Sequence, residues 1–244
     1  MATESKRLPI LEHLQSLKKR VIFSLLAILV GILPAYYAYD TVIQWLLLPF
    51  SGVHGHPVQL IVTHLGEGFL VKFKLCILMS IVMTSPIHIT SLLTFIFPAL
   101  SKTEKQVVAS VLVSGIILAA TSIVITYGYL IPFSIQFLTS NDLIPSNVQV
   151  MLQFKDNLQT VLNMILMGIL VFQFPIVLEL LMFLNLVKRK TMIKNTRYFV
   201  VLIFIIAAAV TPPDVVSQVG FAIPMLLLYG LTLLIAYIMG WGND

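Results

Sequence analysis

Long apolar stretches separated by clusters of positive charge dominate this sequence. Twelve of the 15 Lys and Arg residues lie in three clusters. They are Lys6, Arg7, Lys18, Lys19 and Arg20, then Lys102 and Lys105, then Lys188, Arg189, Lys190, Lys194 and Arg197. If the apolar stretches cross a bilayer in turn, all three clusters fall on one side, and only Lys72, Lys74 and Lys155 remain for the other. The positive-inside rule therefore predicts a polytopic membrane protein with both termini in the cytoplasm.

The composition agrees with a membrane location. The chain has 244 residues, of which 59% are hydrophobic and 10% are charged, and its mean hydropathy is +1.00. A single globule of this size cannot bury so many apolar residues, so lipid must solvate many of them. The net charge of +5 then describes the cytoplasmic face, and we find no nucleic-acid motif. The single cysteine, Cys76, cannot form a disulfide within the chain.

The hydropathy pattern predicts an all-α membrane domain over residues 1–244 with six transmembrane helices. The spans lie near 21–39, 70–93, 107–131, 158–184, 198–211 and 215–239. Residues 1–20 form a cytoplasmic amphipathic segment, since their apolar residues recur every three to four positions. The outer loops, 40–69 and 132–157, are apolar at Trp45–Leu48 and Leu143–Pro145, which predicts short helices on the membrane surface.

The fifth span is unusually short. Its 14 residues reach about 21 Å at about 1.5 Å per residue, less than a hydrocarbon core of about 30 Å. The run Thr211, Pro212, Pro213, Asp214 then ends the helix and reverses the chain, with Asp214 placed to cap the last helix. Within that last helix, Pro224 predicts a kink or a freed carbonyl.

Polar residues at membrane depth are the first candidates for function, because burying them in lipid is costly. Gln173 lies deep in the fourth span, just before Pro175, and is either a hydrogen-bonding contact between helices or a site for a partner helix. Glu179 lies nearer the cytoplasm and can extend toward Lys188 or Arg189. Three histidines share the first outer loop, but the pattern lacks a fourth ligand and predicts no metal site.

Glu104 is the only acidic residue in the inner loop before the third span. Beside Phe95 and Phe97, it could accept a bidentate hydrogen bond from an arginine of an incoming peptide. Alternatively, it pairs with Lys105 or favours the start of the third helix through the helix dipole. We find no zinc-protease, nucleophile-elbow or phosphate-loop motif, so the sequence predicts neither an enzyme nor a cofactor.

The chain resembles the TatC family, the receptors of the twin-arginine protein translocase. The match begins with Leu11-Glu12-His13-Leu14-Gln15-Ser16-Leu17-Lys18-Lys19-Arg20, which is similar to the family's EHLxELRxR motif. Further matches are Glu67-Gly68-Phe69 with Lys74, Ser85-Pro86, Phe95-Ile96-Phe97-Pro98-Ala99-Leu100 ending in Glu104, and Thr211-Pro212-Pro213-Asp214 leading to Ile223-Pro224. The resemblance covers nearly the whole chain.

The resemblance implies a glove-like bundle of six helices, with short helices five and six, in the inner (cytoplasmic) membrane. Its cytoplasmic face would bind twin-arginine signal peptides of folded cargo, using Glu104 together with Phe95, Pro98, Leu100, Lys18, Lys19 and Arg20. The single-span proteins TatA and TatB would dock near Gln173, Pro175, Thr211, Pro212, Pro213 and Asp214. Pro49, Pro86 and Pro224 would be structural. The receptor complex would be homo-oligomeric, lipid-embedded and driven by the proton-motive force.

The chain departs from the family pattern at four positions. Ser16 stands where the family usually has Glu, and Lys18 where it usually has Arg, which removes a planar two-pronged contact. Gln173 replaces a commoner Glu and so lacks a protonatable group, and Gly230 occupies a position often held by Glu.

Two other functions remain open from the residues alone. A small secondary transporter or channel would need several ionisable groups along a central pathway, and the sequence offers only Glu179, Gln173 and His88. An assembly scaffold without a peptide site is the other. A signal peptide with two arginines, compared with one carrying two lysines, would separate these functions, because only a receptor discriminates between them.

Overall fold

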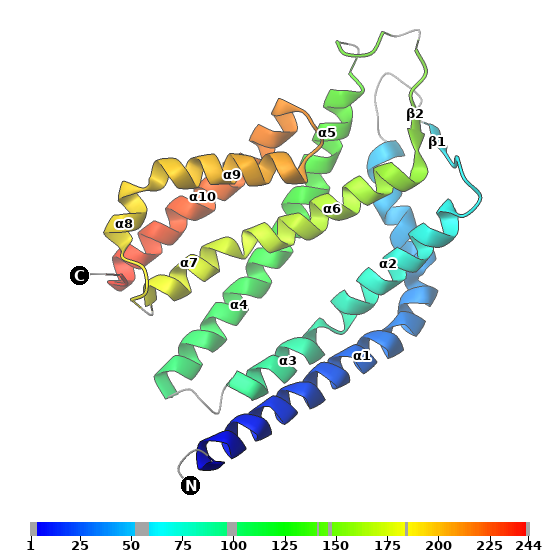
Figure 1. The fold of residues 1–244 in the computed structure, drawn as a ribbon. Coiled ribbons are helices and arrows are strands. Elements are labelled where there is room, and N and C mark those ends of the chain that lie inside the picture. The colour runs from blue at the N-terminus through cyan, green and yellow to red at the C-terminus, as the bar shows by residue number, and fades with distance from the viewer. Residues whose placement is uncertain are drawn as a thin grey trace. The chain divides into compact units, whose positions relative to one another are not determined.

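The computed structural model describes residues 4–51, 59–96, 102–140, 142–145, 148–183 and 185–242, without the side chains of 4–14, 16, 95–96 and 102–104. These residues form helices and one two-stranded sheet (Figure 1). The chain divides into two compact units. Unit 1 comprises Met1–Trp45 and Thr63–Val107, and unit 2 comprises Leu46–Val62 and Val108–Asp244.

Unit 1 is a bundle of helices held by close contacts between backbones. Its elements are most of α1 (Glu4–Ser51), α2 (Glu67–Met83), α3 (Ser85–Ile96) and the first residues of α4 (Lys102–Ile125). The hydroxyl of Ser80 on α2 donates to the carbonyl of Ile28 on α1 at 2.5 Å. Gly31 lies opposite: a Cβ there would be 2.5 Å from Ser80 Oγ. A small residue therefore lets α1 and α2 approach closely, as in other membrane helix pairs.

Helix α1 is longer than the sequence predicted. It continues from Glu4 to Ser51 without a break, so the short surface helix predicted at Trp45–Leu48 is wrong: those residues are part of α1. The predicted end at Tyr39 relied on a drop in hydropathy, and residues 40–48 contain no Gly or Pro that would stop a helix. Pro49 falls in the last turn of α1.

Unit 2 contains the other elements. They are β1 (Gln59–Ile61), the rest of α4, the π-helix η2 (Thr126–Leu130), α5 (Ile131–Leu138), β2 (Met151–Gln153), α6 (Phe154–Phe172), α7 (Phe174–Phe183), α8 (Arg189–Lys194), α9 (Thr196–Val210) and α10 (Val215–Met239). Its core is formed by Phe172 of α6, Met182 of α7, Ile203 of α9 and Phe221 of α10, all 1% exposed or less. Helix α10 packs along α9 and α7 (Figure 1).

The two predicted outer loops are joined by a parallel sheet that the sequence did not predict. Gln59 pairs with Met151, and Ile61 with Gln153. Three-residue strands give too short an alternation of side chains to stand out from loop sequence. The short helix predicted at Leu143–Pro145 is wrong, since residues 142–144 form a turn.

Among the described residues, four helices are long and apolar enough to cross a membrane, and α2 with α3 makes a fifth if that pair, bent by 46°, is one span. Helix α9 has 15 residues, about 22 Å at about 1.5 Å per residue, which confirms that this helix is short. The prediction that the sixth helix is also short is wrong. Helix α10 has 25 residues and contains Pro224 without ending there. The six-span count stays a prediction.

Candidate functional site

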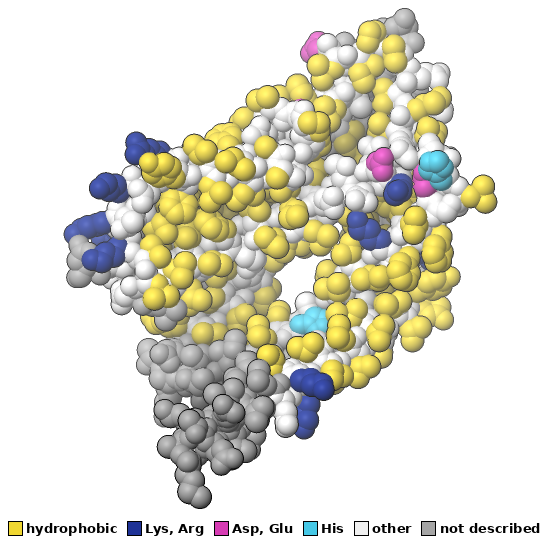
Figure 2. Space-filling model, in the orientation of Figure 1, with side chains coloured by type: hydrophobic (Ala, Val, Ile, Leu, Met, Phe, Trp, Pro, Cys, Tyr) yellow, Lys and Arg dark blue, Asp and Glu magenta, His cyan; other side chains and the backbone are white. Residues whose placement is uncertain are grey.

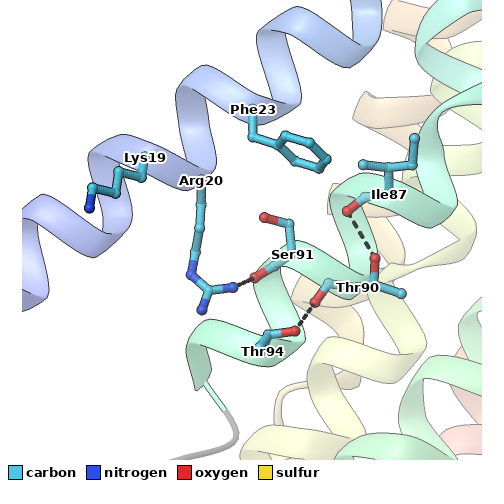
Figure 3. Close-up of a pocket in the computed structure, with 7 residues that line it drawn as sticks. All are labelled: Lys19, Arg20, Phe23, Ile87, Thr90, Ser91 and Thr94. Carbon is cyan, nitrogen blue, oxygen red and sulfur yellow. Dashed lines mark hydrogen bonds between the residues drawn. The ribbon is translucent and has the colours of Figure 1, made fainter.

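A pocket of about 590 Å³ lies in unit 1 between α1 and α3 (Figure 3). It is lined by Lys19, Arg20 and Phe23 of α1 and by Ile87, Thr90, Ser91 and Thr94 of α3. The α3 residues follow an i, i+3, i+4, i+7 spacing, which puts them on one face of a helix. The two basic residues directly precede the apolar run of α1, so the pocket lies at the charged end of a span.

Arg20 ties the two helices together. Its Nη1 donates to the backbone carbonyl of Ser91 at 2.8 Å, across the pocket (Figure 3). The hydroxyls of Thr90 and Thr94 donate back to α3 carbonyls, at 2.8 Å to Pro86 and 2.6 Å to Thr90 respectively. The side chain of Ser91, by contrast, makes no hydrogen bond with any described residue. The bond from Arg20 therefore fixes this part of α1 beside α3.

The first turn of α4 contains Glu104, the residue predicted to receive an arginine pair. Phe95 lies in the last turn of α3, and five residues separate α3 from α4. The side chains of Phe95 and Glu104, and all of Pro98 and Leu100, lie outside the described residues. Their predicted roles are therefore untested.

The basic residues of the predicted patch are open to the surroundings. Lys18 and Lys19 are exposed and Arg20 is partly buried. Within the described part of the chain, no carboxylate forms an ion pair with any of the three. Among the described side chains, this segment of α1 therefore carries positive charge without a neighbouring carboxylate.

Gln173 lies where α6 ends and α7 begins, two residues before the buried Pro175. Its Nε2 donates to the carbonyl of Gly115 on α4 at 3.1 Å. Of the two roles left open by the sequence, this geometry favours the contact between helices. The helix breaks at Gln173, as a proline shortly afterwards favours.

The turn between α9 and α10 has the predicted geometry. Asp214 caps α10, accepting a hydrogen bond from Ser217 N at 2.6 Å, and the Thr211 hydroxyl donates to Ala207 O at 2.9 Å. The prediction for Asp214 is confirmed. Pro212 and Pro213 fill the turn between the two helices. The Ser217 hydroxyl also donates to Ser134 on α5 at 2.6 Å, which attaches the start of α10 to a second helix.

The other ionisable residues at membrane depth have local contacts. His88 Nε2 lies 2.8 Å from Thr84 Oγ1. Arg189, one of the two partners considered for Glu179, instead stacks on Tyr237 and donates to Ala236 O. His54 and His56 lie outside the described residues, and those described contain no group of three or more potential metal ligands.

Sequence analysis missed two features of unit 1. The four α3 pocket residues were not singled out, although three hydroxyl residues on one face of a membrane helix are a recognisable signal. Glu67 was noted in the sequence as part of a family match, without a structural role. It is 3% exposed, and its carboxylate accepts hydrogen bonds from the Thr63 hydroxyl at 2.6 Å and the Thr63 backbone N at 3.3 Å.

The fold defines the class of protein first. Several long apolar helices make this a helical, multi-pass membrane protein.

Comparison with known proteins then gives the family. Residues 12–224 match the sequence model of the family described as Sec-independent protein translocase protein (TatC). The TatC protein of Carboxydothermus hydrogenoformans is 31% identical over 96% of this chain and 94% of its own length. That of Escherichia coli is 27% identical, over 91% of this chain and 85% of its own length. A crystal structure titled twin arginine translocase receptor TatC, in DDM, has a TM-score of 0.78 at 27% identity and covers 95% of this chain and 100% of its own.

The chain belongs to the TatC family. It is therefore a component of the Sec-independent Tat protein translocase, with a role in transport rather than in catalysis.

Proposed function

We propose that this protein is the receptor of the translocase and binds twin-arginine signal peptides of folded proteins at its cytoplasmic face. Glu104 receives the arginine pair, because a carboxylate can accept two parallel hydrogen bonds from one guanidinium group. Phe95, Pro98 and Leu100 form the apolar surroundings of that carboxylate. The similarity to solved structures titled as twin-arginine translocase receptors supports this role.

One observation in unit 1 carries the proposal. The bond from Arg20 to Ser91 holds the basic segment of α1 beside the last turns of α3. Helix α4 begins at Lys102, five residues after α3 ends, and has Glu104 in its first turn. The basic segment of α1 thus lies beside α3, the helix that the chain connects directly to Glu104. The peptide site is bordered by Lys18, Lys19 and Arg20. These residues contact the parts of a signal peptide that follow its arginines.

The positive charges support a cytoplasmic location for the segments that carry them. Figure 2 shows Lys and Arg side chains gathered over α8 at one end of unit 2, as the third basic cluster requires. Of the few cations left for the outer side, Lys72 is held against the rings of Tyr36 and Tyr39, at 4.1 and 4.6 Å from their centroids. With both termini inside, the chain lies in the inner membrane and exposes its peptide site to newly folded cargo.

Partner helices are the second part of the proposal. The helices of TatA and TatB dock against unit 2 near Gln173 and the Thr211–Asp214 turn, where the short α9 thins the bilayer. Many apolar side chains of α9 and α10 face outward, including Ile205 and Leu227 at 60% and 70% exposure. The assembled oligomer then moves cargo with the proton-motive force.

A peptide-binding experiment tests the receptor role. We expect Glu104→Ala to abolish site-specific crosslinking of a twin-arginine signal peptide, while insertion and expression stay normal. Glu104→Asp should retain part of the binding, because it keeps the charge. A matched control is Glu179→Gln, which removes a carboxylate from α7 in unit 2 and should leave crosslinking intact.

The peptide itself provides the second control. A peptide with two lysines in place of the arginines should crosslink weakly to the wild-type chain, since an ammonium group makes no planar two-pronged contact. Normal crosslinking of the twin-arginine peptide to the Glu104→Ala variant, or equal crosslinking of both peptides, would rule out the receptor role.

A further inference from the structure

We propose that the pocket between α1 and α3 binds one anionic phospholipid, with its phosphate at Arg20 and an acyl chain along Phe23 and Ile87. The pocket is built from unit 1 alone, and its volume of about 590 Å³ lies within the range typical of small-molecule sites. The pocket shares Lys19 and Arg20 with the border of the proposed peptide site, but it does not contain Glu104.

The charge of the pocket selects an anion. Among the described residues, the guanidinium group of Arg20 makes one hydrogen bond, from Nη1 to the Ser91 carbonyl. A guanidinium group carries five N–H donors. Lys19 adds an ammonium group, and the Ser91 hydroxyl is a further donor without a partner among the described residues. These donors suit the oxygens of a phosphate group, which arginine binds well.

The direction of the pocket suits a lipid. Arg20 extends from α1 across to α3, whereas the Lys19 side chain ends farther from α3 (Figure 3). On α1 the lining changes from charged to aromatic between Arg20 and Phe23, and on α3 it changes from Thr94 to the apolar Ile87. Both changes run in the direction in which the helices enter the apolar span. A lipid with its head group at the charged end would therefore have its acyl chain at membrane depth.

A second pocket on the other side of Arg20 gives further room for acyl chains. It has a volume of about 300 Å³ and is lined by Arg20 and Ser91 together with apolar residues, among them Val21, Leu25 and Leu92. Arg20 therefore borders both a pocket that contains polar groups and a second, mostly apolar one, which also includes Ser24 and His88. Phe23 is 57% exposed and Leu25 56% exposed.

A twin-arginine peptide fits this pocket poorly. Its arginines would meet Lys19 and Arg20, and like charges repel. No described carboxylate lines the pocket to offset them. An anionic lipid is therefore the occupant that the charges favour.

Native mass spectrometry of the purified full chain tests the proposal. Detergent-solubilised protein is titrated with phosphatidylglycerol or with phosphatidylcholine, and the retained lipid is counted. We expect one phosphatidylglycerol to be retained in preference to phosphatidylcholine. Lys19→Gln should reduce that preference about fivefold, as expected for loss of one cation near anionic lipid, and Arg20→Gln should reduce it at least as much.

Two further variants separate binding from folding. Because Arg20 also joins α1 to α3, Thr94→Phe serves as an independent test: it fills the pocket mouth and leaves the Arg20–Ser91 bond in place. We expect it to remove the preferred lipid. Arg197→Gln, which removes a cation from α9 in unit 2, is the matched control and should retain it.

Competition identifies the occupant. Glycerol phosphate should not displace the lipid, because it lacks the acyl chain. Full displacement by glycerol phosphate would make this a phosphate site and overturn the proposal. Equal retention of both lipids by the wild-type chain would also overturn it. The same holds if Thr94→Phe retains a twin-arginine peptide more weakly than the wild-type chain does while its lipid retention is unchanged. Glu104→Ala should keep the lipid preference, so failure of the receptor role would be seen separately.

Discussion

Each unit contains a helix that breaks at a polar residue two positions before a proline, but the two breaks have different shapes. In unit 1 the break falls at Thr84, before Pro86, and α2 and α3 meet at a 46° bend. In unit 2 it falls at Gln173, before Pro175, and residues 154–183 still form one span of 30 residues. The same local sequence signal thus gives a bend in one unit and a continuous span in the other.

The contacts at the two breaks explain the difference. The Thr84 hydroxyl donates to Ser80 O of its own helix at 2.7 Å, so it does not connect the break to a neighbour. Gln173 instead reaches across to Gly115 of α4. The prolines differ as well: Pro86 is exposed and Pro175 is buried. A proline permits a bend, and the surrounding helices decide whether it forms.

Both breaks also face a glycine of a neighbouring helix. The two glycines differ in how much added side-chain volume their surroundings tolerate. A Cβ on Gly31 would meet Ser80 Oγ at 2.5 Å and Thr84 Cγ2 at 3.0 Å. A Cβ on Gly115 would meet the end of the Gln173 side chain at 3.0 Å. The short side chains in unit 1 have little freedom to move, whereas the longer glutamine can shift. We therefore expect the break in unit 1 to be the less tolerant of added volume.

The largest effect is expected for Gly31→Ala. The added methyl group should separate α1 from α2 and break the bond from Ser80 to Ile28 O, lowering the free energy of unfolding by about 1–3 kcal/mol. Unfolding of the purified protein by SDS in mixed micelles measures this. The double variant Gly31→Ala with Ser80→Ala should recover part of the loss, because the crowded oxygen is gone. No recovery would mean that Ser80 is not the obstacle.

Gln173→Leu should have the next largest effect. It removes the bond to Gly115 O, and a hydrogen bond between membrane helices contributes about 1 kcal/mol. Co-purification of TatA or TatB, measured alongside unfolding, distinguishes its two possible roles. We expect stability to fall and association to decrease. Unchanged association with reduced stability would leave Gln173 as a structural contact only.

Gly115→Ala should change stability by less than about 0.5 kcal/mol. Alanine favours a helix over glycine by about 0.5–1 kcal/mol, and the Gln173 side chain can move to admit the methyl group. The same SDS titration tests this, with Gly31→Ala as the matched variant of unit 1. Equal losses at the two glycines would contradict the difference in tolerance.

We expect Pro86→Ala to have the smallest effect on stability. Its effect on the angle between α2 and α3 should be measurable. Restoring a backbone N–H allows the hydrogen-bond ladder to continue, so the 46° bend should decrease. Distances between spin labels at the exposed Leu70 of α2 and Leu92 of α3 would report it. Pro175→Ala should leave the corresponding distance across α6 and α7 unchanged, because that span is already continuous.

Much of the fold followed from the sequence because hydropathy and helix-stop signals are local. The length of α9 and the cap at Asp214 were predicted by apolar run length and by the residues Thr211–Asp214. The predictions that proved wrong relied on indirect signals in the sequence. A change in hydropathy at Tyr39 was taken for the end of a helix, and the parallel pairing of β1 with β2 joins residues about 90 positions apart.

The candidate site was predictable in its charges but not in its geometry. Lys19 and Arg20 stood out because positive charge at the end of an apolar run is conspicuous. That Arg20 bonds to the Ser91 carbonyl, and that a pocket forms there, depends on how α1 meets α3.

The sequence by itself determined which segments enter the membrane and which end carries positive charge, because transfer into lipid depends on the residues of each segment alone. The break at Thr84 was not predicted, since residues 70–93 were expected to form one span. Only the tertiary structure decided which break bends, which polar group binds a neighbouring helix and where Arg20 is held. Those outcomes depend on contacts between residues distant in the chain, and hydropathy contains no information about such pairs.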